Sequence, residues 1–306
     1  MYLQHFGLRE APFALTPDTG YFFPYRHYAG AMNTLLVALR AGEGFIKVVG
    51  EVGTGKTLLC RKLLNTLEAG FATAYIPNPY LTPHGLYAAV AEELEVPCQR
   101  NMGVHNLIKQ LTGRLAEHHR AGRRVVLCID EAQAMPLETL EALRLLTNLE
   151  TEKTKLLQVV MFGQPELDTR LDNPAVRQLR QRITFSYALQ PMDQDGLAAY
   201  VGHRLQVAGY RGPEIFPPRV LRMLYRGSRG IPRLVNILCH KALLAAWGRG
   251  ALRVSPACMR AAIRDTADAR ARRRRLHLRL GGSAAAVGLV GAIMAPWLQA
   301  GAGGPW

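Results

Sequence analysis

The chain has 306 residues, which is enough for two compact domains. Its composition, with 49% hydrophobic and 20% charged residues, excludes a disordered protein. Its formal net charge is +15, and six arginines between residues 270 and 279 supply a large share of that charge. The rest is a mild excess, so total charge does not separate a nucleic-acid partner from an anionic membrane.

In chain order, short apolar runs alternate with helix-length amphipathic stretches as far as residue 190. The runs cover residues 45–50, 72–77, 123–130, 156–163 and 183–189, and they predict parallel strands buried on both faces by helices. After Pro191 only helices are predicted, over residues 194–207, 217–226, 232–247 and 255–266. We therefore expect an α/β domain with a parallel sheet at residues 1–190 and a helical lid at 191–268.

A phosphate-binding loop follows the first predicted strand. Gly50-Glu51-Val52-Gly53-Thr54-Gly55-Lys56-Thr57 fits G-x-x-x-x-G-K-[ST] and leads through Leu58 into an amphipathic helix. The glycines let backbone N–H groups surround phosphates, Lys56 reaches the β- and γ-phosphates, and Thr57 can ligate Mg²⁺. This motif predicts a P-loop ATPase that uses ATP and Mg²⁺.

Two carboxylates end the third predicted strand, VVLCIDE. Asp130 stands where it can hold Mg²⁺ through water, and Glu131 stands where it can act as the general base that polarises the attacking water. The pair predicts hydrolysis of ATP in addition to nucleotide binding.

Other polar candidates leave alternatives open. Gln164 follows a predicted strand and can touch the γ-phosphate or its water, or it is an ordinary turn residue. Arg177, Arg180 and Arg182 in VRQLRQRI can reach a neighbouring subunit's nucleotide, or they form a solvated basic face. Arg233 lies just inside a helix started by Pro232, where it is either a functional residue or an ordinary surface arginine at a helix end.

Five cysteines lie far apart, at positions 60, 98, 128, 239 and 258, and form no CxxC pair. They predict buried thiols in a reducing compartment, with neither a zinc site nor a disulfide framework. The start, MYLQHFGLREAPF, lacks the apolar run of a signal peptide, so export of the folded part is not expected.

Taken together, the motifs resemble the AAA+ ATPases of the ExeA/GspA general secretion family, which includes the ATPase of MSHA-pilus biogenesis (MshM-like). The resemblance rests on GEVGTGKT, VVLCIDEAQ, VVMFGQPEL, VRQLRQRI, HRLQVAG, GIPRLVN and the opening FGLREAPFALTPD, and it runs to about residue 267. It implies that Lys56 and Thr57 are Walker A, Asp130 and Glu131 Walker B, Gln164 sensor 1, Arg182 or Arg180 the arginine finger, and Arg233 sensor 2.

The resemblance also implies oligomers whose subunits share nucleotide sites. Members of this family often continue past a membrane span into a peptidoglycan-binding domain, whereas this sequence stops at Trp306. We therefore expect the shorter, pilus-biogenesis type.

The last 27 residues, from Leu280, carry no charge, and residues 280–300 are long enough for one transmembrane helix. The basic segment at residues 269–279 then places the ATPase on the cytoplasmic side of a bacterial inner membrane by the positive-inside rule. Ala284, Gly288 and Ala292 offer a face for another helix, and chance small residues explain it equally well. The alternative interpretation of the whole tail is a flexible Gly/Ala-rich end that follows a basic patch for binding nucleic acid.

These observations predict a membrane-anchored ATPase that assists assembly of a type IV pilus or a type II secretion-like complex. Its expected partners are further copies of itself, inner-membrane assembly proteins and membrane lipid. The alternative is a DNA-handling ATPase of the transposition type, because DEAQ after a Walker B strand occurs there also. Nucleic acid is not the expected partner, since the folded region shows no DNA-reading module.

Overall fold

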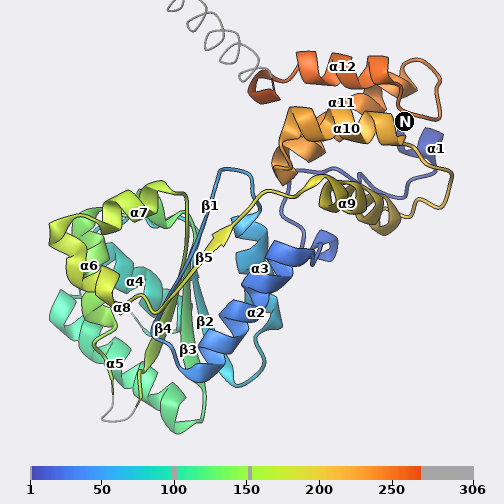
Figure 1. Ribbon diagram of the computed structural model, residues 1–306. Coiled ribbons are helices and arrows are strands. Elements are labelled where there is room, and N and C mark those ends of the chain that lie inside the picture. Colours follow the sequence, from blue (N-terminus) through green and yellow to red (C-terminus); the bar gives the residue numbers. More distant parts are fainter. Residues whose placement is uncertain (1, 98–101, 151–153, 270–306) are drawn as a thin grey trace, which may run out of the picture.

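The computed structural model describes residues 2–97, 102–150 and 154–269. Within them, a sheet domain is joined to a helical lid at its upper right (Figure 1). The strands are β1 (Phe45–Gly50), β2 (Phe71–Ile76), β3 (Arg124–Ile129), β4 (Leu157–Gly163) and β5 (Phe185–Leu189). The helices before the lid are α1 (Tyr2–Phe6), α2 (Arg26–Ala41), α3 (Lys56–Thr66), α4 (Pro83–Glu93), α5 (Val104–Arg120), α6 (Leu137–Leu146), α7 (Glu166–Leu171) and α8 (Arg177–Arg182). Single 3₁₀ turns lie at Thr19–Tyr21, Ala132–Ala134 and Pro174–Val176.

The five strands form one parallel sheet in the order β2-β3-β4-β1-β5. All five predicted strands are confirmed, with ends shifted by at most two residues. The expectation of burial on both faces holds for β1, β3 and β4 but is wrong for the edge strands β2 and β5. In β5 only Leu189 is buried, because an edge strand has a neighbour on one side alone.

Two layers of helices cover the sheet (Figure 1). Successive side chains of a strand point to opposite faces, so Val126 and Cys128 of β3 pack with α2 and α3, while Val125 and Leu127 pack with α4, α5 and α6. The apolar core on the α2 and α3 side runs on without interruption into the lid.

The lid comprises α9 (Gln194–Val207), α10 (Pro218–Ser228), α11 (Pro232–Trp247) and α12 (Pro256–Arg264), so the predicted helical lid is confirmed. Asp193 caps α9 by accepting a hydrogen bond from the Gly196 N–H at 2.7 Å. A proline opens each of the other three helices, where its missing N–H costs no hydrogen bond. The proposed domain limits at residues 190 and 268 stay predictions.

The N-terminal segment lies against the lid. The Arg9 N–H donates to the Ala208 carbonyl at 2.9 Å, and the Phe13 and Phe216 rings meet edge to face at 5.9 Å. Arg204 is 4% exposed and donates to the Pro12 carbonyl and the Tyr200 hydroxyl, which ties this segment to α9. A buried guanidinium needs such partners, so the segment is held firmly.

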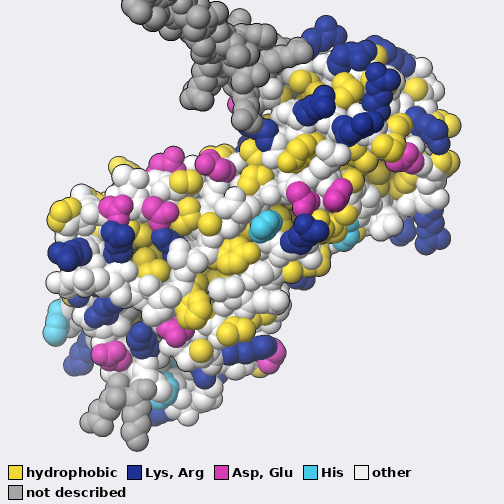
Figure 2. Space-filling view, viewed as in Figure 1, with side chains coloured by type: hydrophobic (Ala, Val, Ile, Leu, Met, Phe, Trp, Pro, Cys, Tyr) yellow, Lys and Arg dark blue, Asp and Glu magenta, His cyan; other side chains and the backbone are white. Residues whose placement is uncertain are grey.

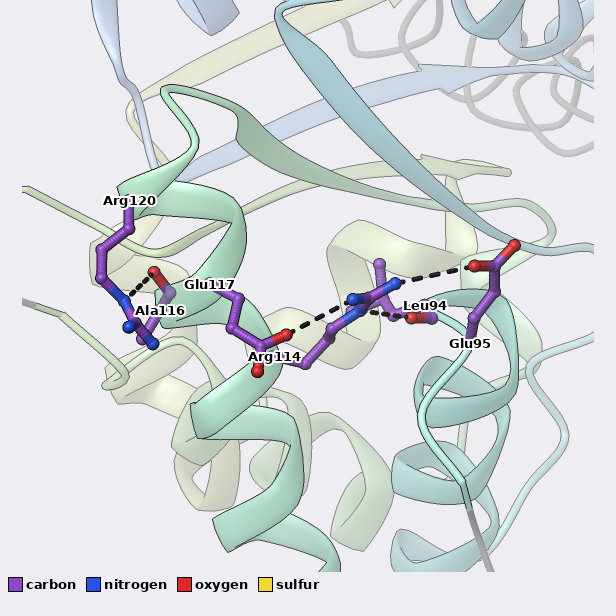
Figure 3. A network of polar contacts seen from close by, with 6 residues as sticks. All are labelled: Leu94, Glu95, Arg114, Ala116, Glu117 and Arg120. Atoms are coloured by element: carbon purple, nitrogen blue, oxygen red, sulfur yellow. Dashed lines mark hydrogen bonds and ion pairs between the residues drawn. The ribbon is translucent and has the colours of Figure 1, made fainter.

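On the other face of the sheet, one arginine joins α4 to α5 (Figure 3). Arg114 donates to the Leu94 carbonyl at 2.9 Å and lies 3.6 Å from Glu95 and 3.3 Å from Glu117. The contact secures the turn after α4, where Glu95 has a left-handed φ of 55°.

Cys60, Cys128, Cys239 and Cys258 are buried free thiols, as the sequence predicts for them, and Cys98 lies outside the described residues. No helix within residues 2–97, 102–150 and 154–269 is long and apolar enough to span a bilayer. The predicted transmembrane helix and all but the first residue of the basic segment lie outside the described residues.

Gly230, between α10 and α11, generates a prediction about stability. Its φ is +75°, and a Cβ there would lie 1.9 Å from the Met192 carbonyl oxygen. Gly230→Ala should therefore lower the free energy of unfolding by about 1–3 kcal/mol or more, measured by urea denaturation. Gly202→Ala is the matched control, because nothing lies within 4 Å of its Cβ position in α9 and alanine favours a helix. Equal midpoints for Gly230→Ala and the unchanged chain would contradict the steric argument.

Candidate functional site

The loop between β1 and α3 has the shape that a phosphate requires. Gly53 and Gly55 have φ values of +79° and +92°, a region that residues with a Cβ rarely adopt. The Tyr28 hydroxyl donates to the Thr54 carbonyl at 2.7 Å, and the Thr54 hydroxyl donates to the Glu51 carbonyl at 2.8 Å. These bonds hold the loop open ahead of the N-terminus of α3.

Lys56 is buried at the base of this loop. Its ammonium donates to the carbonyls of Gly50 at 2.8 Å and Glu51 at 3.1 Å, and the residue is 4% exposed. Burial lowers the pKa of Lys56 below its ordinary value, and the carboxylates of Glu131 and Asp130 offset only part of this effect. A phosphate beside the ammonium would favour its charged form and so offset the effect of burial on the pKa.

Asp130 lies at the C-terminal end of β3 and is 3% exposed. Burial raises the pKa of Asp130, although the Thr57 hydroxyl and the Glu131 N–H donate hydrogen bonds to its carboxylate. The Thr57 hydroxyl and the Asp130 carboxylate are thus neighbours, and two hard oxygen ligands beside a phosphate loop fit Mg²⁺. A divalent cation there would also stabilise the buried carboxylate.

Glu131 is held by two glutamines. The Gln133 amide donates to Glu131 Oε2 at 2.5 Å, and the Gln164 amide donates to the same oxygen at 3.1 Å. Gln133 Oε1 in turn accepts from the Gln164 backbone N–H at 2.9 Å. Burial favours the neutral acid, but these two hydrogen bonds and the Lys56 charge outweigh it and lower the pKa of Glu131. The carboxylate is therefore ionised and has a fixed orientation.

The lid contacts the loop at the start of α11. The Arg233 N–H donates to the Gly53 carbonyl at 3.2 Å, and a Cβ on Gly53 would lie 2.8 Å from the Arg233 Cβ. Arg233 therefore lies against the phosphate loop, and its assignment as sensor 2 stays a prediction.

A cavity of about 320 Å³ lies between the loop, the lid and the N-terminal segment. Nine of the candidate residues line it: Val52, Gly53, Gly55, Lys56, Thr57, Leu58, Glu131, Gln164 and Arg233. Four other candidate residues do not line it: Gly50 at the end of β1, and Glu51, Thr54 and Asp130 in the adjoining loops. A second cavity of about 620 Å³ adjoins it and shares five lining residues with it, so the space suits a ligand larger than a phosphate group.

The three candidate arginines of α8 lie elsewhere. Arg180 pairs with Asp172 and its side chain is 62% exposed, while Arg182 donates to the Thr147 hydroxyl at 3.3 Å. Neither these two nor Arg177 lines the cavity of their own chain.

Other residues of the site were missed from the sequence. Ala14, Leu15, Thr16, Pro17, Asp18, Tyr200, Arg204, Pro232 and Asn236 line the cavity, and Tyr28 and Gln133 support its loops. Gln133 follows the Asp-Glu pair by two positions, which is a usable signal. The N-terminal segment offers none, because its place depends on contacts with helices some 190 residues away.

Comparison with known proteins agrees with this geometry. Residues 39–171 match the family described as an AAA domain. Over 254 residues, or 83% of the chain, the sequence is 46% identical to general secretion pathway protein A of Aeromonas hydrophila. The match covers 46% of that protein, so the chain spans under half of its relative's length.

Solved structures show the same fold at low identity. The ORC2 protein of Aeropyrum pernix, in ADPNP and ADP complexes, aligns with a TM-score of 0.63 at 16% identity, over 84% of this chain and 71% of that one. Cdc6p of Pyrobaculum aerophilum aligns with a TM-score of 0.64 at 20% identity, over 82% and 69%. The chain therefore has an AAA+ P-loop fold with a parallel five-stranded sheet and a helical lid, and the match of residues 39–171 to the AAA domain implies nucleotide binding.

Lys56 gives the prediction for binding. Lys56→Met keeps the buried stem but removes the charge, so affinity for a fluorescent ATP analogue should fall about ten- to hundredfold, the value of one or two charged hydrogen bonds. Lys62→Met, farther along the same helix and outside the cavity lining, is the control and should bind normally. Unaltered affinity in Lys56→Met would refute a phosphate-binding role.

Proposed function

We propose that this AAA-domain chain is a membrane-anchored ATPase that assists assembly of a type IV pilus or a type II secretion-like complex. The single observation that carries the hydrolytic part is Glu131, an ionised carboxylate aimed by two glutamine amides into the cavity that Lys56 lines. The 46% identity to a protein named for the general secretion pathway supports the class of client.

The positions of these side chains support a mechanism of ATP hydrolysis. Lys56 would bind the β- and γ-phosphate oxygens, and Thr57 and Asp130 would hold Mg²⁺, which when bound would supply positive charge to those phosphates. Glu131 accepts a proton from a water whose oxygen attacks the γ-phosphorus, and the bond to the β–γ bridging oxygen breaks. ADP and phosphate result. Gln133 and Gln164 keep the accepting oxygen in place throughout.

A neighbouring copy of the chain completes this site in our proposal. Arg180 or Arg182 would enter from the next subunit and stabilise charge in the transition state, as an arginine finger does. Helix α8 presents three arginines, and none of them lines the cavity of its own chain. The active form is then a homo-oligomer.

Membrane attachment is the second part of the proposal, and its support is the sequence beyond residue 269. Six arginines are followed by 27 uncharged residues, which suits a single span of a bacterial inner membrane with the ATPase on the cytoplasmic side. Inner-membrane assembly proteins and lipid are then its partners at that surface.

Glu131→Gln tests the chemistry. The amide cannot accept a proton but keeps the size of the side chain, so turnover should fall at least about a hundredfold while ATP affinity stays within about twofold. Steady-state hydrolysis and analogue binding by the detergent-solubilised chain measure the two quantities. Glu138→Gln, an exposed residue of α6, should behave as the unchanged chain. Undiminished turnover in Glu131→Gln would rule out the general base.

Alkaline extraction of cell membranes tests the anchor. The unchanged chain should remain in the pellet, whereas Leu289→Arg with Val290→Arg should be released, because each charge in the middle of a span costs about 2.5–3.5 kcal/mol. Arginines at Gly301 and Ala302, outside the predicted span, should leave the chain in the pellet.

The DNA-handling alternative has its own readout in the same preparations. Recovery of the unchanged chain in the soluble fraction, together with strong and salt-sensitive stimulation of hydrolysis by DNA, would replace the anchored ATPase by the alternative.

A further inference from the structure

Positive charge in the folded part is concentrated in the lid. Residues 1–190 contain 20 Lys and Arg against 18 Asp and Glu, a net charge of +2. Residues 191–269 contain 12 against 5, a net charge of +7 in less than half the length. Figure 2 shows the result, with dark blue side chains gathered over the lid, where α10 and α12 lie, and more evenly mixed signs over the sheet domain.

Four exposed arginines lie on α12 and on the loop before it. Arg260 and Arg264 are four residues apart and so share one face of α12, opposite the buried Cys258, Met259 and Ala262. Arg249 and Arg253 stand in the loop between α11 and α12. Among the described residues, none of the four is ion-paired with a carboxylate. Their charges are available to an external partner.

Two large apolar side chains near Arg249 and Arg253 in the sequence are exposed. Trp247, at the end of α11, is 38% exposed, and Leu252, in the loop, is 65% exposed. The loop is held in place, since the Val254 N–H donates to the Ile215 carbonyl at 2.9 Å and the His5 ring lies 3.1 Å from the Ala251 carbonyl. We call Trp247, Leu252, Arg249, Arg253, Arg260 and Arg264 the lid face.

The neighbouring helix α10 adds to this charge. Arg219, Arg222 and Arg226 recur at helical spacing on its exposed side, opposite the buried Val220 and Leu224. Because α10 packs against both α11 and α12, its arginines extend the positive potential of the lid face.

We propose that the lid face docks on the surface of an anionic phospholipid bilayer. A tryptophan and a leucine among arginines match the interface, where an indole ring sits among headgroups and arginine attracts acidic lipid. The chain leaves the lid directly after α12, and its sequence continues with six arginines and 27 uncharged residues. This inference rests on the proposed membrane anchor and adds that the folded lid itself lies on the lipid.

Helix α11 connects the lid face to the nucleotide cavity. Arg233 near its start lines the cavity, and Trp247 at its end belongs to the lid face. The helix has 16 residues, about 24 Å at the rise of an α-helix. A bilayer that contacts the lid face would therefore contact the same helix that carries Arg233 at the cavity.

Fluorescence of Trp247 in the full chain tests the contact. Trp297→Phe with Trp306→Phe leaves Trp247 as the one tryptophan of the sequence. This chain is reconstituted into vesicles of phosphatidylcholine, or of phosphatidylcholine with phosphatidylglycerol, that contain equal amounts of brominated phosphatidylcholine. We expect quenching of Trp247 in the anionic vesicles well above that in the zwitterionic ones.

A matched pair of charge reversals identifies the surface. Arg260→Glu with Arg264→Glu should bring quenching in anionic vesicles down to the zwitterionic level. Lys109→Glu with Arg120→Glu makes the same charge change on α5, at the end of the molecule away from the lid (Figure 1), and should leave quenching unaltered.

The outcomes separate the docking surface from the anchor. Co-flotation with both vesicle types but equal quenching would overturn the lid face and leave the anchor intact. Quenching in anionic vesicles by a chain that does not float with zwitterionic ones would support the lid face and overturn the anchor. If the Arg260→Glu and Arg264→Glu chain lost binding to DNA but showed unaltered quenching by lipid, nucleic acid would replace the bilayer as the partner of the lid face.

Discussion

One backbone hydrogen bond joins the two halves of the nucleotide site. The Arg233 N–H, in the first turn of α11, donates to the Gly53 carbonyl in the phosphate loop. Its geometry needs two positions without side chains: Gly53 lies against Arg233, and Gly230 lies against the Met192 carbonyl. Both glycines also have positive φ, so a Cβ would bring strain and collision together. The position of the lid over the loop therefore depends on the absence of side chains at Gly53 and Gly230.

Two charged side chains of the site are buried, and this burial costs free energy that a bound nucleotide would offset. Lys56 and Asp130 are almost fully buried, and burial shifts the pKa of each toward its neutral form. A phosphate beside the ammonium and a divalent cation beside the carboxylate would reverse both effects. Glu131 differs, because glutamine donors already stabilise its charge. Glu131 is therefore stabilised as a carboxylate without a ligand, whereas a phosphate and a cation would stabilise the charged forms of Lys56 and Asp130.

One continuous apolar core joins the sheet to the lid. A single cluster extends from one face of the sheet through α2 and α3 into the lid, and the N-terminal segment packs into it through Phe6, Leu8 and Phe13. Arg204 fastens that segment to α9 and lines the same cavity as Lys56. Helix α11 runs from the cavity to the exposed Trp247, so a single helix connects the phosphate loop to the outer surface of the lid.

The amino-acid sequence by itself determined the elements and the chemistry of the phosphate loop. Apolar runs located all five strands, and Pro232 marked the start of α11. The motif G-x-x-x-x-G-K-T and the apolar run before Asp130 and Glu131 predicted the phosphate site, because these signals are local. Only the tertiary structure decided that Gln133 joins Gln164 on Glu131, that residues 14–18 line the cavity and that β5 is an exposed edge. Those facts depend on residues far apart in the chain coming into contact, and no local pattern of hydrophobicity or backbone preference records such a contact.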